Sequence, residues 1–161
     1  MIEVKFDASE IIEGLGELGQ NIKRGVSIAI QKSAFEIEGQ SKINAPVDSG
    51  RLRDSIMVFF DSAIFQAGEM ILDGAGGSSK LSATIMPMVE YAGWVHRGTD
   101  PHYIEGNNYL YWNGASHPVT HVFHPGTKPN PFMERGLEAS EGAIREHFNR
   151  EIERAVDNFN K

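Results

Sequence analysis

Apolar residues in the first quarter of the chain recur at steps of three and four positions. This spacing places them on one side of an α-helix, so it predicts a long amphipathic helix over about 8–43. Asp7 and Glu10 have the spacing of a capping box at its start, and four glycines weaken its first half by about 1 kcal/mol each relative to alanine. The predicted apolar stripe consists of Ile11, Leu15, Leu18, Ile22, Val26, Ala29, Ala34 and Ile37.

The middle of the chain, about 54–123, shows the pattern of short β-strands instead. Between 81 and 86 apolar and polar residues alternate, which is typical of a strand with one buried face. A stretch rich in glycine and serine at 73–80 is predicted to be a surface loop. Further short strands are predicted at 55–60, 109–112 and 119–123.

A second long helix is predicted over about 131–159. Asn130 and Pro131 form a cap residue followed by proline at the first helical position. Two long helices around a small, mostly antiparallel sheet make an α+β fold, and 161 residues fit one domain, 1–161. The apolar stripe of the second helix consists of Leu137, Ile144, Phe148, Ile152, Val156 and Phe159.

Composition and charge narrow the classes of protein that fit this fold. The chain is 40% hydrophobic and 23% charged, which is usual for a folded globular protein and not for a disordered or membrane protein. Its net charge of −7 argues against specific nucleic-acid binding. The absence of cysteine excludes a disulfide scaffold and a Cys-ligated zinc. No stretch resembles a signal peptide or a membrane span, so we expect no membrane association.

Five histidines lie close together in the sequence and raise the question of a metal centre. His117 and His121 have the separation of a helical zinc pair, but Pro118 and β-branched neighbours indicate extended chain, where these positions lie about 13 Å apart. Neither a phosphate-binding loop nor a nucleophile elbow occurs in the sequence. We therefore expect no catalytic residue, no metal and no cofactor. The alternative is a metal-dependent hydrolase that combines carboxylates with His96, His117, His121 or His124.

Three other segments contain four of the seven prolines and several glycines. We call 45–56 the first motif, 91–99 the second and 124–132 the third. Proline fixes one backbone angle and the glycines supply turns, so these motifs are predicted to be rigid corners that direct the helices away from the sheet. Such corners suit a protein whose shape is its function.

In this order, the segments APVDSGRLRDSI, YAGWVHRGT and HPGTKPNPFMERGLEAS resemble the HK97 gp10-like tail-component family of tailed bacteriophages and prophages, over roughly 37–139. His96 stands where family members often have an acidic residue, and an insert at 100–116 is particular to this chain. The resemblance implies a structural virion protein of the neck or tail, without enzymatic activity, that acts in head–tail joining or tail completion. It carries over as structural or interface residues Pro46, Asp48, Gly50, Arg51, Leu52, Tyr91, Ala92, Gly98, Thr99, Pro125, Gly126, Pro129, Pro131 and Phe132.

The resemblance also implies ring-shaped homo-oligomers on the tail axis, in contact with neighbouring neck and tail proteins. Such virions are assembled in the cytoplasm of the bacterial host. DNA is expected to pass through the lumen of the ring without specific binding, which fits the acidic balance of the chain. Besides the hydrolase, the remaining alternative is an adaptor that binds protein outside any virion.

Overall fold

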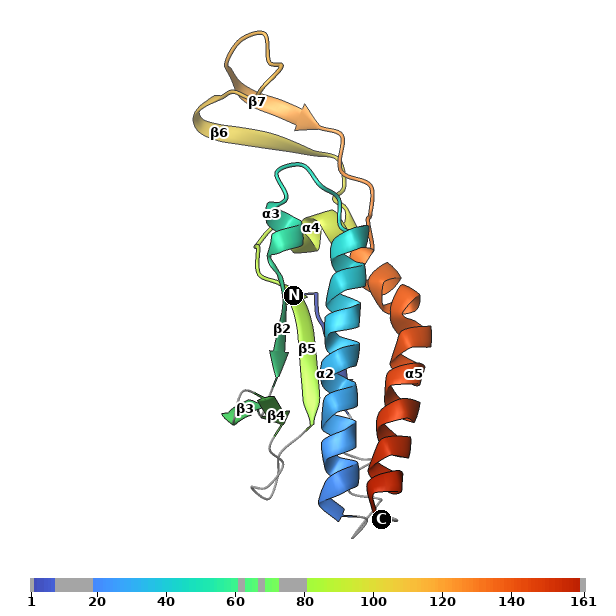
Figure 1. Cartoon of the computed structure of the whole chain (residues 1–161). Coiled ribbons are helices and arrows are strands. Elements are labelled where there is room, and N and C mark those ends of the chain that lie inside the picture. Colours follow the sequence, from blue (N-terminus) through green and yellow to red (C-terminus); the bar gives the residue numbers. More distant parts are fainter. Residues whose placement is uncertain (1, 8–18, 61–62, 67–68, 73–80, 160–161) are drawn as a thin grey trace.

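The computed structural model describes residues 2–7, 19–60, 63–66, 69–72 and 81–159. These residues form an α+β fold, as predicted (Figure 1). Two long helices lie side by side, a small antiparallel sheet covers one of them, and a two-stranded arm projects from one end.

The two long helices, α2 (Gly19–Asn44) and α5 (Phe132–Phe159), run antiparallel and pack along their lengths (Figure 1). Their backbones come very close at Gly136 of α5. A Cβ atom added there would lie 2.7 Å from the Cα of Ser41 and also collide with its hydroxyl oxygen. Real Cβ atoms essentially never come so close to backbone, so this crossing requires glycine.

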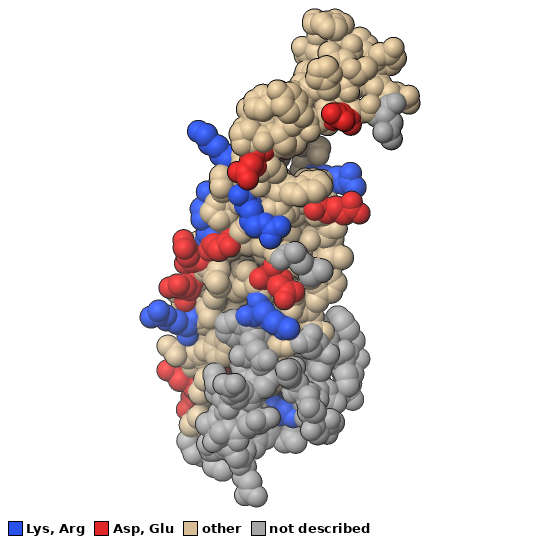
Figure 2. Space-filling view, turned by 180° about the vertical axis from the view of Figure 1, so that it is seen from behind, with Lys and Arg blue, Asp and Glu red and all other residues tan. Residues whose placement is uncertain are grey.

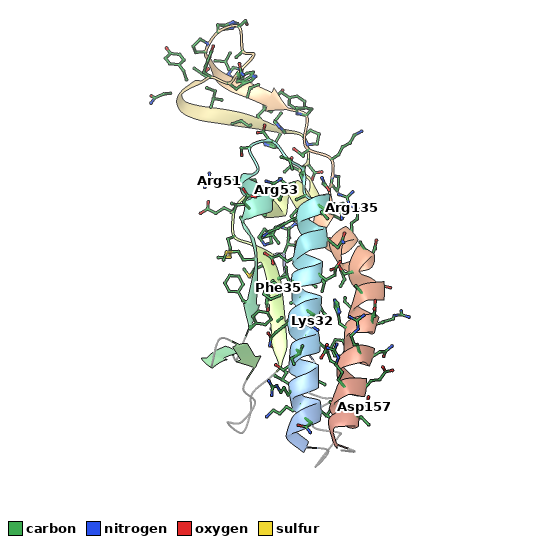
Figure 3. All side chains as sticks on the ribbon, viewed as in Figure 1. Lys32, Phe35, Arg51, Arg53, Arg135 and Asp157 are labelled. Carbon is green, nitrogen blue, oxygen red and sulfur yellow. The ribbon has the colours of Figure 1, made fainter. Side chains whose placement is uncertain are left out.

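A buried carboxylate, Glu151 of α5, lies in the same interface. Lys32 of α2 donates a hydrogen bond to its Oε1 at 2.7 Å, and Arg154 donates to the same oxygen at 2.9 Å. Burial alone would raise the pKa of Glu151, but the hydrogen bond and charge of Lys32, together with the charges of Arg154 and Arg150, outweigh it and lower the pKa. Glu151 is therefore held ionised between the helices, and Figure 3 shows Lys32 on the side of α2 that faces α5.

The main sheet consists of β1 (Val4–Asp7), β2 (Ile56–Phe60) and β5 (Ser82–Pro87), in the antiparallel order β1-β5-β2. Val4 and Val58 are paired with Ile85 from its two sides. Because α2 packs against β2 and β5, the hydrophobic core forms between helix and sheet and continues to the start of α5. The fully buried large side chains include Val26, Ile30, Ile37, Ile56, Leu81, Ile85, Phe132 and Met133.

The remaining described elements are short or lie outside this core. The strands β3 (Ala63–Gln66) and β4 (Glu69–Leu72) pair as a small antiparallel hairpin. There are also two short helices, α3 (Arg51–Asp54) and α4 (Ala92–Arg97). The projecting arm is formed by β6 (His102–Leu110) and β7 (Val119–His124). Within the described ranges, no helix has the length and apolarity needed to span a bilayer.

The structure corrects the strand predictions in three respects. The strand predicted to have one buried face, β5, is buried on both, since Ser82 is 1% and Thr84 9% exposed. The strand predicted at 109–112 instead begins at His102 and ends at Leu110. The strands β1, β3 and β4 and the short helices α3 and α4 were not predicted. The predicted helical residues 8–18 and the predicted loop 73–80 lie outside the described residues.

Gly136→Ala should destabilise the protein, although alanine is the better helix former. In an open helical position the change stabilises by up to about 1 kcal/mol. At Gly136 the added methyl meets the backbone of Ser41, so we expect the free energy of unfolding to fall by about 1–3 kcal/mol, the usual cost of overpacking. Urea denaturation measures the difference. Gly142→Ala is the matched control, because a Cβ there has open space on the same helix, and it should stabilise. Equal effects of the two substitutions would contradict the close crossing.

Lys32→Met should lower the free energy of unfolding at pH 7 by about 1.5–3 kcal/mol, because a hydrogen bond to a buried charged group is lost. The pKa of Glu151 is depressed in the folded state, so its stabilising contribution is present above the unfolded pKa of about 4.3 and is lost as the pH falls through the folded value. The difference between wild type and variant should therefore shrink in urea titrations at acidic pH.

Lys42→Met provides the control for this substitution, because its partner, the half-buried Glu38, lies one turn away on the same helix and not on α5. It should cost less than about 0.5 kcal/mol, the usual value for such a pair. A Lys32→Met penalty that is the same at pH 7 and at acidic pH would show that the ion pair with Glu151 is not its cause.

Candidate functional site

The second and third motifs meet at a pair of threonines, Thr99 and Thr127. Each backbone N–H donates to the carbonyl of the other, both at 3.0 Å, and the Thr127 N–H also donates to the hydroxyl of Thr99 at 3.0 Å. Gly98 and Gly126 precede them with φ of 75° and 86°. A Cβ on Gly98 would collide with the Thr127 carbonyl, and one on Gly126 with the Thr99 carbonyl. Each motif therefore needs its glycine, because a carbonyl of the other motif lies where a side chain would be. We call this contact the threonine pair.

The third motif also closes the end of α4. The Asn130 N–H donates to the carbonyls of Val95 and His96, both at 3.1 Å. Phe132 is fully buried, and its ring meets the His96 imidazole edge to face with centroids 5.4 Å apart. The buried His96 ring in turn donates to the Glu134 carboxylate at the start of α5. These contacts lock α4 to α5.

The first motif lies at the same end of the body. Gly50 is buried with φ of 82°, and it allows the turn from which Leu52 enters the core. Pro46, Asp48 and Arg51 are exposed. Figure 3 shows Arg51 and Arg53 at the end of the body that carries the arm, as it does Arg135.

Arg135 joins the end of α2, one residue before the first motif, to the third motif. Its guanidinium donates to the Asn44 carbonyl at 3.4 Å and to the side-chain oxygen of Asn130. The sequence contained no signal for this link, because Arg135 and Asn44 are 91 positions apart. Asn130 was expected only as a helix cap. The three motifs thus converge on one end of the helix pair.

The arm rises from this junction and carries most of the histidines. His102 and His124 face each other across the strands with ring centroids 5.1 Å apart. His102 Nδ1 donates to the Asp100 carbonyl at 2.7 Å, whereas His124 Nδ1 accepts from the Gly126 N–H at 3.1 Å. His121 is paired with Glu105 further along the arm. Among the residues that the structure describes, no three His, Asp or Glu side chains are placed to share a metal ion.

A hollow of about 560 Å³ lies where the arm joins the body. Two residues of the second motif that the sequence singled out, Tyr91 and Thr99, contribute to its lining. We call it the base hollow. It is lined by Tyr91, Trp94, Val95, Thr99, Asp100, His102, Ile104, His124 and Thr127.

A second hollow of about 550 Å³ continues along the arm and shares Ile104 and His124 with the first. Tyr111 and Trp112 line its far part. The arm also exposes aromatic side chains on its other surfaces, with Tyr103 at 70%, Tyr109 at 75% and Phe123 at 53% exposure. The arm is therefore an apolar surface, in contrast to the charged body.

A family model described as "Bacteriophage HK97-gp10, putative tail-component" matches residues 9–98, more than half of the chain. The chain belongs to the HK97-gp10-like family. No curated protein and no solved structure matches the chain significantly.

The HK97-gp10-like match covers the first motif and all but the last residue of the second. In the structure this region comprises α2, the main sheet without β1, the β3–β4 hairpin, and the short helices α3 and α4. The threonine pair joins the end of this region to the third motif, while the arm and α5 lie beyond the matched residues. The match thus covers only part of the helix-and-sheet body, and both the second long helix and the arm lie outside it.

Gly98→Ala should lower the free energy of unfolding by more than Gly114→Ala. Both glycines have positive φ, so both substitutions carry backbone strain of about 1–3 kcal/mol. A Cβ at Gly114 meets nothing within 4 Å, whereas one at Gly98 would also collide with the Thr127 carbonyl oxygen and lie 2.9 Å from Pro129 N. Chemical denaturation of both variants measures the difference. If Gly114→Ala costs as much as Gly98→Ala, the threonine pair is not a tight contact in solution.

Proposed function

We propose that this chain is a structural subunit of a phage neck or tail that acts in head–tail joining or tail completion. Membership of a bacteriophage tail-component family supports a place in the virion and contacts with other tail proteins. The observation that carries the finer proposal is the convergence of all three motifs on one end of an elongated body, beside an exposed aromatic arm. The chain acts as one domain whose corners orient contact surfaces.

The subunit forms a ring on the tail axis. A ring needs two different surfaces on each copy, because neighbouring copies meet head to tail. The arm and the body provide surfaces of different chemistry: on the face that Figure 2 shows, acidic and basic side chains cover the described part of the body and are almost missing from the arm. The net charge of −7 disfavours adhesion of DNA to such a ring, so DNA can pass through its lumen.

The role of this subunit is geometric and not catalytic. The polar groups at the motif junction are used for structure: the Asn130 N–H closes α4, Arg135 bonds the end of α2, and His96 bonds Glu134. The assembled protein is located in virions built in the host cytoplasm. Its partners are further copies of itself and the adjacent neck and tail proteins.

Deletion of the gene from its phage or prophage tests the proposal. We expect particle yield to collapse, with DNA-filled heads and tails that remain separate if the protein joins them. Tails of abnormal length or with unfinished ends would instead assign it to tail completion. Negative-stain electron microscopy of the lysate distinguishes these forms, and purified protein added to the lysate should restore joined particles. Normal infectious particles in its absence would overturn the proposed function.

Microscopy of the purified protein, alone and mixed with tail tubes, tests the ring directly. Rings, or caps on the tube ends, are expected. Under the adaptor or hydrolase alternatives the protein should ignore tail tubes, and in the hydrolase case it should retain a stoichiometric metal ion after dialysis against a chelator.

A further inference from the structure

The arm lacks the support that a β-hairpin normally needs. β6 and β7 pair with each other, and within the described residues neither makes an extended contact with another element. A lone two-stranded hairpin is marginally stable in water, because too little apolar surface is covered. Figure 1 shows the arm extending away from the helices and the main sheet. A further surface is therefore needed to cover it.

The arm is also the least charged part of an acidic chain. Between 101 and 127, Glu105 is the only Asp, Glu, Lys or Arg, although the whole chain contains 37 such residues. Two copies of a chain with net charge −7 repel each other wherever their acidic surfaces meet. The arm is the surface on which two copies can touch with the least repulsion. Contact through the arm is thus electrostatically suited to a second copy of this chain.

The arm end exposes large side chains, and the arm base contains a hollow. The far end exposes three large aromatic side chains, with Tyr109 at 75%, Tyr111 at 69% and Trp112 at 47% exposure. The base hollow has a volume of about 560 Å³ and is lined in part by the aromatic rings of Tyr91 and Trp94. One chain therefore carries both a projecting aromatic group and a cavity of the size that proteins use for ligands. This is the pair of unlike surfaces that a head-to-tail contact needs.

Length and area are consistent with this pairing. Because β6 is irregular between Glu105 and Leu110, the length of the arm is that of the six residues of β7, about 20 Å at the usual rise of a strand. A helix layer and a sheet layer together are about 20 Å thick, so the arm can reach across the body of a neighbour. Each fully buried aromatic side chain removes about 150–250 Å² from water. Tyr111 and Trp112, which are already partly covered, therefore supply part of the about 800 Å² per partner found in stable interfaces, and the rest of the arm has to supply the remainder.

We propose that the arm of one subunit lies across the next copy of the chain and inserts its end aromatics, Tyr111 and Trp112, into the base hollow of that copy. This contact rests on the proposed ring and identifies the surfaces through which its subunits bind. The arm of the receiving copy reaches in turn to the following one, so the same contact repeats around the ring.

Engineered disulfides test the contact, because the chain has no cysteine of its own. Asn113→Cys places a thiol at the end of the arm, and Asp100→Cys places one in the base hollow. Since β6 separates the two positions along one arm, a bond within a single chain is excluded by disulfide geometry. We expect the double variant to form a ladder of linked multimers on a non-reducing gel after mild oxidation. Asn113→Cys combined with Asn149→Cys, on the exposed side of α5, is the control and should form none.

The ladder is read both in concentrated purified protein and in assembled particles. A ladder in either sample supports the contact. No ladder in both, or a ladder of equal strength in the control, would overturn it. Linkage of the Asn113→Cys thiol to a different tail protein in particles, or binding of the arm to phosphatidylglycerol vesicles without self-association, would also overturn it. Loss of particle joining in the deletion phage is measured separately, so the proposed function can stand while this contact fails.

Removal of the aromatic groups provides a second test. Tyr111→Ser combined with Trp112→Ser should weaken self-association at least 10-fold, measured by size-exclusion chromatography with light scattering. His117→Ser, an exposed change in the same connection between β6 and β7, is the control and should leave self-association unchanged. Intact α-helical circular dichroism confirms that the body is folded in each variant. Unchanged self-association of the double variant would contradict the insertion of these side chains.

Discussion

The close crossing of α2 and α5 at Gly136 and Ser41 is the constraint on which the rest of the structure depends. The helix backbones touch there, so the start of α5 is held against the end of α2. This position puts Phe132 into the core and brings Arg135 to the Asn44 carbonyl. The third motif, which leads directly into α5, is thereby placed against α4 and the second motif. The positions of the threonine pair and of the base hollow therefore depend on the place where α2 and α5 meet without a side chain between them.

The buried ion pair of Lys32 and Glu151 belongs to the same interface and serves a different purpose. Apolar packing between two helices tolerates sliding and rotation, whereas a buried carboxylate must keep its donors. Lys32 of α2 reaches Glu151 of α5 only when the helices are in register, whereas Arg154 binds Glu151 from within α5. The glycine crossing sets the distance between the helices near one end, and the ion pair sets their alignment further along. A rigid helix pair follows, on which the motif junction can be held in a fixed position.

Features that depend on local spacing could be predicted from the sequence. The two long helices follow from apolar steps of three and four, and Pro131 together with Asn130 marks the start of the second to within one residue. Long-range pairing could not be predicted. β1 is a four-residue strand whose partner, Ser82–Pro87, is far away in the chain, and nothing in the segment Val4–Asp7 shows this pairing. The two buried faces of β5 likewise depend on what packs around it.

The candidate site shows the same division. Proline and glycine identified the three motifs as corners, but the contacts between them join residues that are distant in sequence, such as Thr99 with Thr127. The start of β6 was missed because His102 to Asn108 shows no regular alternation that would distinguish a strand from an irregular insert. The apolar surface of the arm was present in the composition of this segment all along. It became meaningful only when the structure placed it outside the core.

The threonine pair also determines how far the end of the arm can move relative to the body. The arm, about 20 Å long, leaves the body through two segments of chain that are joined there by the backbone hydrogen bonds of Thr99 and Thr127. A tilt of about 10° at the threonine pair therefore moves the far end of the arm by about 3.5 Å, roughly the rise of one residue along a strand. The stiffness of one threonine pair thus controls the position of every aromatic ring at the far end.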